Sequence, residues 1–266
     1  MIKLIENYEP ELFEKIVVGE ELSACLISTL YELYLSDTKT ALFWKVLAES
    51  GSTHAIIALF NGCLHIIKTS DALSEYQEIA QFISLVAPNA AVEGSENTLK
   101  GLLPFFTDHS LHTRTVLVRA LPALPRSRDA EISRNIKLDD MYFLLCKCFR
   151  GFGSKGGRGV WMTDTSLRLR KRDGAMYGIF EGGTLVSGCG TYSRCGRFQV
   201  ISGVATIPQY RSLGYAGSLV NRAAMDIFSA GRIPIICAAD DRALSLYKKL
   251  GFEEFSSYST LKHTDS

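Results

Sequence analysis

Long apolar runs are missing from this chain of 266 residues. No segment reaches the roughly 18 consecutive apolar residues that a helix needs to cross a membrane. The N-terminal segment carries Glu6, Glu9, Glu11 and Glu14, whereas a secretory signal peptide needs an uninterrupted apolar core at this place. We therefore expect a cytoplasmic protein that has no membrane partner.

Paired cysteine motifs are missing as well. The sequence contains seven cysteines, an odd number, with no Cys-x-x-Cys pair and no ladder of histidines nearby. They are Cys25, Cys63, Cys146, Cys148, Cys189, Cys195 and Cys237. Isolated thiols of this kind are typical of reduced, buried side chains rather than of disulfides or zinc sites. His109 and His112 would share one face of a helix, but they lack a third ligand candidate, so we expect no metal.

An excess of charge of one sign is also absent. The 29 basic and 28 acidic residues give a formal net charge of +1, so no global field attracts nucleic acid or an acidic membrane. With 47% hydrophobic and 21% charged residues, the composition is that of a folded protein with one large domain or two ordinary ones. We expect no nucleic-acid partner, and a local site must select the partner that does bind.

Helical and strand patterns alternate in the first half of the chain. The Asn61-Gly62 dipeptide is the strongest hairpin signal in the sequence, and Ser74 is a candidate N-cap. The patterns predict a helix, a hairpin, a second helix and a strand, at residues 20–35, 54–67, 74–88 and 113–121. This order indicates an α/β layer, but nothing in it groups titratable or nucleophilic residues at a telling spacing.

A break in the pattern separates the two halves. Pro122, Pro125 and a burst of charged residues interrupt the apolar periodicity between residues 121 and 140. We place the domain boundary near residue 125, which gives an N-terminal domain of residues 1–124 and a C-terminal domain of residues 125–266.

The second half starts with a helical face and then becomes rich in glycine. Met141, Leu144 and Leu145 share the helical face. Residues 150–161 contain five glycines, each of which costs a helix about 1 kcal/mol relative to alanine, so we expect a mobile loop beside a pocket. An Arg-Gly RNA-binding element is the alternative, but the segment has no aromatic repeat.

Alternating patterns continue to the end of the chain. They predict a helix to residue 172, three antiparallel strands with turns at 182–183 and 194–196, a helix from 214 to 231, a strand at 233–239, a short helix stopped by Gly251 and a final strand.

The segment "VATIPQYRSLGYAGSLV", residues 204–220, joins a strand pattern to a helix pattern. The first N–H groups of a helix have no intrahelical carbonyl, and the helix dipole adds partial positive charge there, so such a turn binds anions. Gly214 and Gly217 remove Cβ atoms, and Arg211 supplies a cation that can meet phosphate oxygens. The spacing suits a diphosphate, although an ordinary tight turn with close helix packing is the alternative.

A second element, "DDRALSLYKKLGF", follows at residues 240–252. Together the two segments resemble the GNAT superfamily of acyl-CoA-dependent N-acyltransferases over about residues 137–262. The resemblance implies an α/β (α+β) fold with a mixed, largely antiparallel central sheet flanked by helices. The first half has the same order of elements but no matching Arg-x-x-Gly-x-Ala turn. We therefore expect a tandem protein whose N-terminal domain is a degenerate GNAT-like copy that binds no acyl-CoA.

The resemblance also implies roles for individual residues. The backbone of the strand before the turn pairs with the pantetheine arm of coenzyme A, and the turn itself wraps the pyrophosphate. By position the strand residues are Val204, Ala205 and Thr206, and the turn residues are Arg211, Ser212, Leu213, Gly214, Tyr215, Ala216 and Gly217. Tyr247 takes the place of a general acid that protonates the departing thiolate. Its alternative is a core aromatic, because Leu244, Tyr247 and Leu250 share a helical spacing.

The sequence departs from the family pattern in three ways. The strand at 198–204 has no carboxylate where many members place a glutamate, so the base that deprotonates the amine is not identified. Asp240 and Asp241 stand where asparagine is frequent, which suits a helix N-cap but repels a nearby diphosphate. Ser212 replaces a frequent glycine, which is tolerable if its φ is negative.

These features together predict an N-acetyltransferase. Acetyl-CoA is the expected co-substrate, and the acetyl group passes to a primary amine by direct attack in a ternary complex. The acceptor is a small-molecule or peptide amine, and the protein is a monomer or a homodimer. A non-catalytic acyl-CoA-binding sensor or scaffold is the alternative, and nucleotide binding at the same turn is another.

Overall fold

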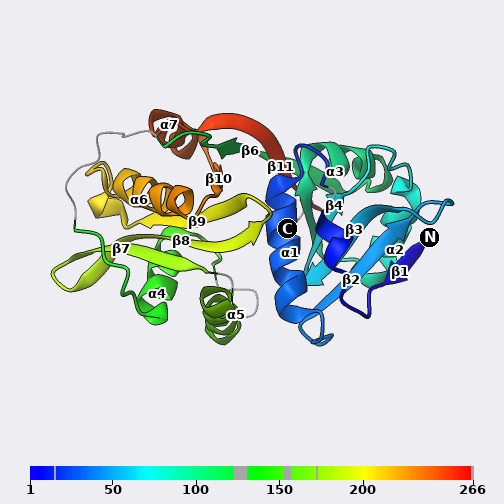
Figure 1. Ribbon diagram of the computed structural model, residues 1–266, viewed down its shortest axis with the longest axis horizontal. Coiled ribbons are helices and arrows are strands. Elements are labelled where there is room, and N and C mark those ends of the chain that lie inside the picture. Colours follow the sequence, from blue (N-terminus) through cyan, green and yellow to red (C-terminus); the bar gives the residue numbers. More distant parts are fainter. Residues whose placement is uncertain (15, 123–130, 153–156, 172, 265–266) are drawn as a thin grey trace. The chain divides into compact units, whose positions relative to one another are not determined.

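The computed structural model describes residues 1–14, 16–122, 131–152, 157–171 and 173–264. Within them the chain forms two compact units. The N-terminal unit consists of Met1–Val116 together with Phe255–Ser266, and the C-terminal unit consists of Leu117–Glu254. Each unit contains a layer of strands flanked by helices (Figure 1). The predicted fold class is confirmed.

The predicted boundary at residue 125 lies outside the described residues, so the division into 1–124 and 125–266 stays a prediction. The contacts divide the chain differently because of its last strand. β11 (Glu253–His263) pairs antiparallel with β5 (Ala91–Ser95), and Tyr258 lies opposite Ser95. Residues near the C-terminus therefore complete the sheet of the N-terminal unit, a long-range pairing that no local sequence pattern indicates.

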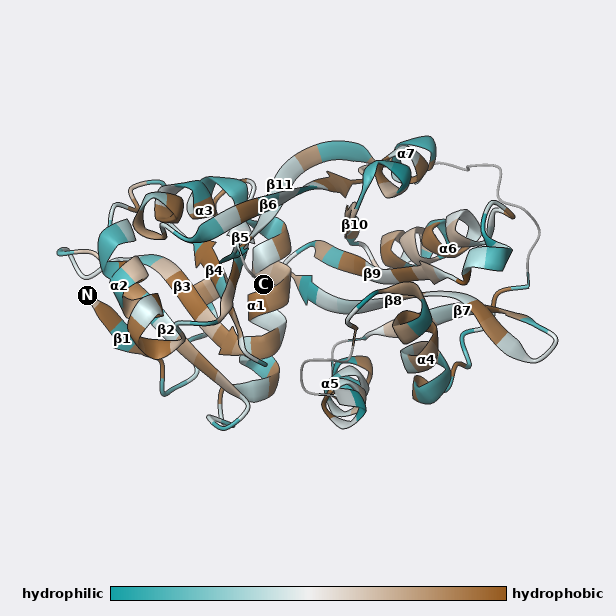
Figure 2. Ribbon diagram, turned by 180° about the vertical axis from the view of Figure 1, so that it is seen from behind, coloured by the Kyte–Doolittle hydropathy of each residue, from teal (hydrophilic) through white to brown (hydrophobic). Residues whose placement is uncertain are grey.

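The sheet of the N-terminal unit has the strand order β1-β2-β3-β4-β5-β11-β6. β4 and β5 run parallel, whereas β1 to β4 are joined by antiparallel pairing. Figure 2 shows apolar residues gathered on β2, β3 and β4. The other elements of the unit are β1 (Ile2–Leu4), β2 (Ala41–Leu47), β3 (Thr53–Phe60), β4 (Cys63–Lys68), β6 (His109–Val118), α1 (Glu21–Tyr34), α2 (Tyr76–Val86), α3 (Glu96–Leu102) and the 3₁₀ turns η1 (Pro10–Phe13) and η2 (Leu103–Phe105).

Most predictions for this unit are confirmed, including the hairpin, whose turn places Asn61 at φ 49° and Gly62 at φ 70°. Two details are wrong. α2 begins one residue later than a Ser74 cap requires, and its N-cap is Glu75, whose side chain makes no capping bond. His109 and His112 lie on β6 rather than on a helix, and residues three apart on a strand point to opposite faces.

The C-terminal unit has the strand order β10-β9-β8-β7. β9 and β10 run parallel, and the other pairs are antiparallel. In Figure 1, α6 lies on one side of these strands and α4 and α5 lie on the other. The elements are α4 (Leu138–Cys148), α5 (Gly157–Lys171), β7 (Ala175–Glu181), β8 (Thr184–Cys195), β9 (Phe198–Thr206), η3 (Pro208–Tyr210), α6 (Tyr215–Ser229), β10 (Ile233–Cys237) and α7 (Asp241–Lys249).

The two halves of the chain repeat one succession of elements. Three antiparallel strands are followed by a helix, a strand parallel to the third, a short helix and a further strand. In the first half these are β2, β3, β4, α2, β5, α3 and β6, and in the second half β7, β8, β9, α6, β10, α7 and β11. This internal repeat agrees with the expected tandem organisation.

The glycine-rich segment is the main error of local prediction. The glycine content predicts a loop over residues 150–161, but α5 begins at Gly157 and includes Gly159. Packing outweighs the helix cost of the glycines, because the ring of Trp161 on α5 lies 5.6 Å from that of Tyr142 on α4. Residues 153–156 lie outside the described residues, so the predicted mobile loop there stays a prediction.

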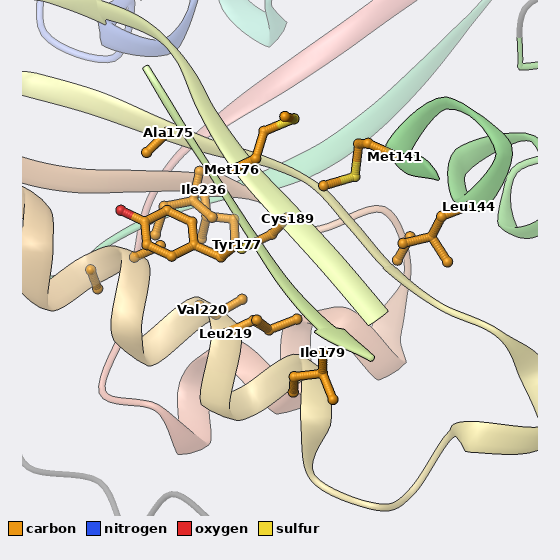
Figure 3. Close-up of a cluster of buried hydrophobic side chains, with 14 of the residues drawn as sticks. Met141, Leu144, Ala175, Met176, Tyr177, Ile179, Cys189, Leu219, Val220 and Ile236 are labelled. Atoms are coloured by element: carbon orange, nitrogen blue, oxygen red, sulfur yellow. The ribbon is translucent and has the colours of Figure 1, made fainter. Parts of the chain in front are cut away.

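The core of the C-terminal unit fills both faces of its sheet. Met141 and Leu144 reach the strands from α4, and Leu219 and Val220 reach them from α6 (Figure 3). Cys189 on β8 is fully buried within the same cluster. In the described part of the chain, no helix combines the length and the apolar character required to cross a bilayer.

Candidate functional site

β9 and β10 are paired over only part of their length. The parallel pairing runs from Phe198 opposite Ile233 to Ile201 opposite Ile236, and it goes no further among the described residues. On its other side β9 stays paired with β8 as far as Thr206. The last five residues of β9 therefore form an edge from which β10 has diverged, and backbone groups at such an edge can bind an extended ligand.

A β-bulge lies within the part of β9 that is paired with β8 but no longer with β10. The register with β8 changes from Ser202 opposite Gly190 to Ala205 opposite Gly188, so that Gly203 and Val204 together face the single residue Cys189. Gly203 has φ 62°, a conformation that glycine adopts without the Cβ penalty. The bulge redirects the backbone beside Val204. Gly203 is not among the predicted site residues, although an isolated glycine within a strand pattern is the signal for a bulge.

The three predicted strand residues lie at this edge. Ala205 is buried, and Val204 and Thr206 are half-buried. The hydroxyl of Ser187 donates to the Ala205 carbonyl at 3.1 Å. The Nε of Arg211 donates to the Thr206 carbonyl at 3.1 Å, which ties the start of the turn to the end of the strand.

The turn between β9 and α6 contains two residues with positive φ. Gly214 is the N-cap of α6 and has φ 84°. Ser212 has φ 64°, so the condition under which serine would be tolerated here, a negative φ, is not met. For a residue with a Cβ this left-handed conformation costs about 1–2 kcal/mol, and glycine would fit it better. Arg242 of α7 donates to the Ser212 hydroxyl at 3.4 Å, which gives the side chain a partner in this conformation.

The N-terminus of α6 has the geometry of an anion site. The first hydrogen bond of the helix runs from the Ser218 amide to the Gly214 carbonyl, four residues earlier, at 3.1 Å. The amides of Tyr215, Ala216 and Gly217 precede it, and an α-helix provides no carbonyl partner for amides at these positions. The helix dipole favours negative charge at the same point. Leu213 precedes the cap and is 40% exposed. The predicted turn residues are thus brought together around one helix terminus.

Gly217 also lies close to α7. A Cβ built on it would lie 3.6 Å from Cδ1 of Leu246 and 3.8 Å from Cδ2 of Leu250, which are ordinary contact distances. The residue therefore faces α7, and the space beside it would accept a Cβ, so helix packing does not require glycine at this position. Its proposed contact with an anion stays a prediction, made through the backbone amide alone.

Two arginines set the charge around the turn. Arg211 is exposed at its start, and Arg242 reaches Ser212 from the first turn of α7. Asp240 is occupied as the N-cap of α7, because its Oδ1 accepts the Ala243 amide at 2.8 Å. A carboxylate that caps a helix is partly neutralised by the dipole. Asp240 is visible in the sequence as a helix cap, whereas Arg242, the cation two residues later, is not among the predicted site residues.

Glu181 also has a partner in this region. The Tyr215 hydroxyl, in the first turn of α6, donates a hydrogen bond to the carboxylate of Glu181 at the end of β7. This hydrogen bond links α6 to the hairpin formed by β7 and β8.

Tyr247 lies on α7 and is 5% exposed. Burial raises the pKa of its phenol well above the ordinary value, and the nearby Cys189, Cys237 and Asp240 add to the increase. The group is therefore protonated at neutral pH and can donate a hydrogen bond. Among the described residues its hydroxyl has no hydrogen-bond partner, while its ring packs against Phe252 with centroids 6.2 Å apart. Both the acid role and the core role are compatible with this position.

The architecture and the site define the GNAT fold. Residues 170–261 match the family model described as GNAT acetyltransferase. This match confirms the resemblance for the C-terminal half, including both motifs. No curated protein matches the sequence of this chain.

Solved structures with the same fold extend the likeness to nearly the whole chain. A GCN5-related N-acetyltransferase from Sphaerobacter thermophilus is 13% identical with a TM-score of 0.65, covering 98% of this chain and 95% of its own. One from Kribbella flavida is also 13% identical, with a TM-score of 0.64 over 91% and 94% of the two chains. A tandem GNAT protein from the clavulanic acid biosynthesis pathway is 10% identical with a TM-score of 0.62 over 98% of both chains. At these identities the likeness shows the fold.

Proposed function

We propose that the C-terminal unit transfers an acetyl group from acetyl-CoA to a primary amine. The observation that carries this proposal is the edge of β9 that has no β10 partner. This edge is followed by the turn that leads to the N-terminus of α6. An extended pantetheine arm suits the backbone of Val204 to Thr206, and a pyrophosphate suits the helix terminus beside Arg211 and Arg242. The GNAT acetyltransferase match over residues 170–261 supports the same co-substrate.

The reaction needs one bond to form and one to break. The amine nitrogen attacks the thioester carbonyl carbon, the carbon–sulfur bond breaks, the amine loses a proton and the thiolate gains one. A phenol held near the sulfur can supply that proton, and Tyr247 is our candidate. Because burial raises its pKa, its hydrogen bond to the sulfur is available at all ordinary pH values. Complete transfer of its proton is less favourable than from an ordinary phenol.

The amine must be neutral when it attacks. An alkylamine with a pKa of about 10.4 is almost entirely protonated at neutral pH, so the site must remove a proton. β9 carries no aspartate or glutamate. We propose that water molecules carry the proton away from the amine, or that the acceptor has a lower pKa than a simple alkylamine. The acceptor is a small-molecule or peptide amine.

We propose that the N-terminal unit binds no acyl-CoA. The segment that corresponds to the signature turn joins β4 to α2 at residues 69–75 and contains neither arginine nor glycine. Instead it carries Asp71 and Glu75, and Glu75 lies at the N-cap of α2, where a diphosphate would sit. The carboxylate at this terminus repels a diphosphate, and Asp71 is paired with Lys68 at 3.2 Å.

All seven cysteines are free thiols, which supports our proposed cytoplasmic location.

The burial of Tyr247 favours a second candidate, a non-catalytic acyl-CoA-binding sensor or scaffold. Release of free thiol from acetyl-CoA, measured across a panel of small and peptide amines, separates the two. Turnover with any amine supports the transferase, whereas tight acetyl-CoA binding without turnover supports the sensor. ATP that competes as well as coenzyme A would instead support nucleotide binding at the turn.

A further inference from the structure

Three metal-ligating side chains meet on one face of the sheet in the N-terminal unit. Cys63 and His65 lie two residues apart on β4, so their side chains point to the same face. The parallel pairing of β4 with β5 sets Glu93 directly opposite His65. This pairing places the carboxylate beside the imidazole and the thiol, on the same face.

The distances suit a single ion. The ligand atoms of Cys63, His65 and Glu93 all lie within 4.8 Å of one another, and Nδ1 of His65 is 3.6 Å from Oε2 of Glu93. Ligand bonds of about 2.0–2.3 Å in a tetrahedral zinc site imply ligand separations of about 3.3–3.8 Å. The His65–Glu93 separation already falls in this range, and side-chain rotation can bring the thiol closer. The three residues are half-buried, so an ion can enter and water can complete its shell.

Neighbouring groups orient the carboxylate of Glu93. The Tyr258 hydroxyl donates to Oε2 at 2.9 Å, and the Thr260 hydroxyl donates to Oε1 at 3.4 Å. Each oxygen retains a second lone pair, and hydrogen bonds of this kind are the usual support of a metal-bound carboxylate. Arg114 donates to the Thr260 hydroxyl at 3.1 Å, so a chain of two hydrogen bonds connects this cation to the Glu93 carboxylate. The positive charge of Arg114 reduces the attraction of the carboxylate for a metal ion.

We propose that Cys63, His65 and Glu93 bind one Zn²⁺ ion, with water as the fourth ligand. A thiolate, an imidazole and a carboxylate together favour zinc over magnesium or calcium, which prefer oxygen ligands. The Cys63 thiol loses its proton to solvent when the ion binds. The sequence predicts no metal site, because it has no paired cysteines and no third ligand candidate for His109 and His112. No local pattern indicates that parallel strands bring Glu93 beside a Cys-x-His pair.

The ordinary alternative is a structural cluster without an ion. In it, His65 and Glu93 attract one another, and the Cys63 thiol donates to the Ala91 carbonyl at 3.3 Å. The two arrangements differ in whether the thiol is deprotonated, and cobalt detects this difference. Co²⁺ occupies zinc sites, and a bound thiolate gives it an intense sulfur-to-metal charge-transfer absorption.

The test is a Co²⁺ titration of the full chain, followed by displacement with Zn²⁺. We expect one equivalent of Co²⁺ to produce the charge-transfer absorption, and one equivalent of Zn²⁺ to abolish it. Cys63→Ser should lose the absorption, whereas Cys146→Ser, which changes an exposed thiol in the C-terminal unit, should retain it. Tyr258→Phe should retain the absorption with about 10- to 100-fold weaker binding, because it removes only a supporting hydrogen bond.

Equilibrium dialysis with Zn²⁺ alone gives a second reading that does not depend on the fold of a single variant. The wild-type chain should bind one Zn²⁺, and His65→Gln should bind it at least tenfold more weakly. Failure of the wild-type chain to bind Zn²⁺ at micromolar concentration would overturn the proposal. Charge-transfer absorption that survives in Cys63→Ser would also overturn it, since the thiolate would then belong to another residue.

Discussion

Ile201 of β9 and Ile236 of β10 are the last paired residues of these two parallel strands. Two residues beyond Ile201, the bulge at Gly203 redirects the β9 backbone, and α6 begins at Tyr215 after the turn. One strand edge and one helix terminus are therefore held in a fixed succession. The proposed acetyl-CoA site depends on this succession more than on any single side chain.

Arg211→Ala should weaken acetyl-CoA binding by about 10- to 100-fold, because a charged hydrogen bond to phosphate contributes about 1.5–3 kcal/mol. The loss should not occur with acetyl-pantetheine, which lacks the diphosphate. Arg222→Ala is a matched control, since this arginine lies further along α6 and pairs with Asp226 at 3.0 Å. Titration calorimetry with both thioesters measures the effect. Equal weakening for the two ligands would contradict a diphosphate contact.

The two glycines of the signature should respond oppositely to alanine. Gly214→Ala places a Cβ at φ 84° and should lower the free energy of unfolding by about 1–2 kcal/mol. Gly217→Ala adds a methyl group at ordinary contact distance from Leu246, within a helix, and should raise it by up to about 1 kcal/mol. Urea denaturation of both variants gives the values. A destabilised Gly217→Ala would show that the helices pack more closely than described.

Tyr247→Phe separates the two roles of this buried ring. If the hydroxyl protonates or hydrogen-bonds the departing sulfur, kcat should fall by about 100-fold or more while the KM for acetyl-CoA changes little. The midpoint of thermal unfolding should stay close to that of the wild type, because the ring still packs against Phe252. Unchanged kcat would assign Tyr247 to the core.

Glu20 gives a pH-dependent prediction in the N-terminal unit. The side chain is 1% exposed, its Oε2 has no hydrogen-bond partner among the described residues, and burial raises the pKa of its carboxyl. Because the pKa is higher in the folded than in the unfolded protein, the protonated carboxyl stabilises the fold. This contribution to the free energy of unfolding is complete below the ordinary carboxyl pKa and is lost as pH rises through the raised pKa. Glu20→Gln should therefore increase the free energy of unfolding at neutral pH. It should also make the decrease in that free energy between acidic and neutral pH smaller.

Glu96→Gln is the matched control for this experiment. The hydrogen bond from Lys100 lowers the pKa of Glu96, so its contribution is present above the ordinary pKa and is lost as pH falls. This variant should be slightly less stable than the wild type at neutral pH, by less than about 1 kcal/mol, because Lys100 is exposed and Glu96 is only half-buried. Thermal unfolding from pH 4 to pH 8 measures both. A Glu20→Gln variant that is less stable at neutral pH would contradict the account.

Local patterns predict most of the elements because each carries its own signal. The Asn61-Gly62 turn, the helix that begins after Gly214 and the strands around Gly182 all follow from short-range chemistry. The start of α5 at Gly157 does not, since the packing of Trp161 against Tyr142 outweighs the intrinsic preference of glycine. Tertiary contacts of this kind leave no trace in a propensity pattern.

The site shows the same division between local and long-range information. Arg211, Gly214 and Tyr247 are visible as motifs, and Arg211 and Gly214 lie at the turn between β9 and α6, as their motif predicts. The positive φ of Ser212 and the contact of Arg242 with its hydroxyl depend on how α7 meets the turn. In the N-terminal unit, the meeting of Cys63 and His65 with Glu93 depends on a parallel register. Spacing along the chain cannot predict contacts set by register.

Hydrogen–deuterium exchange of the full chain, with and without acetyl-CoA, tests the central claim most directly. The account predicts slower exchange of backbone amides at residues 202–206 and 212–217 when acetyl-CoA is present. It predicts no change at residues 69–75, the corresponding turn of the N-terminal unit. Exchange that is unchanged at 202–206 and 212–217 under saturating acetyl-CoA would contradict it.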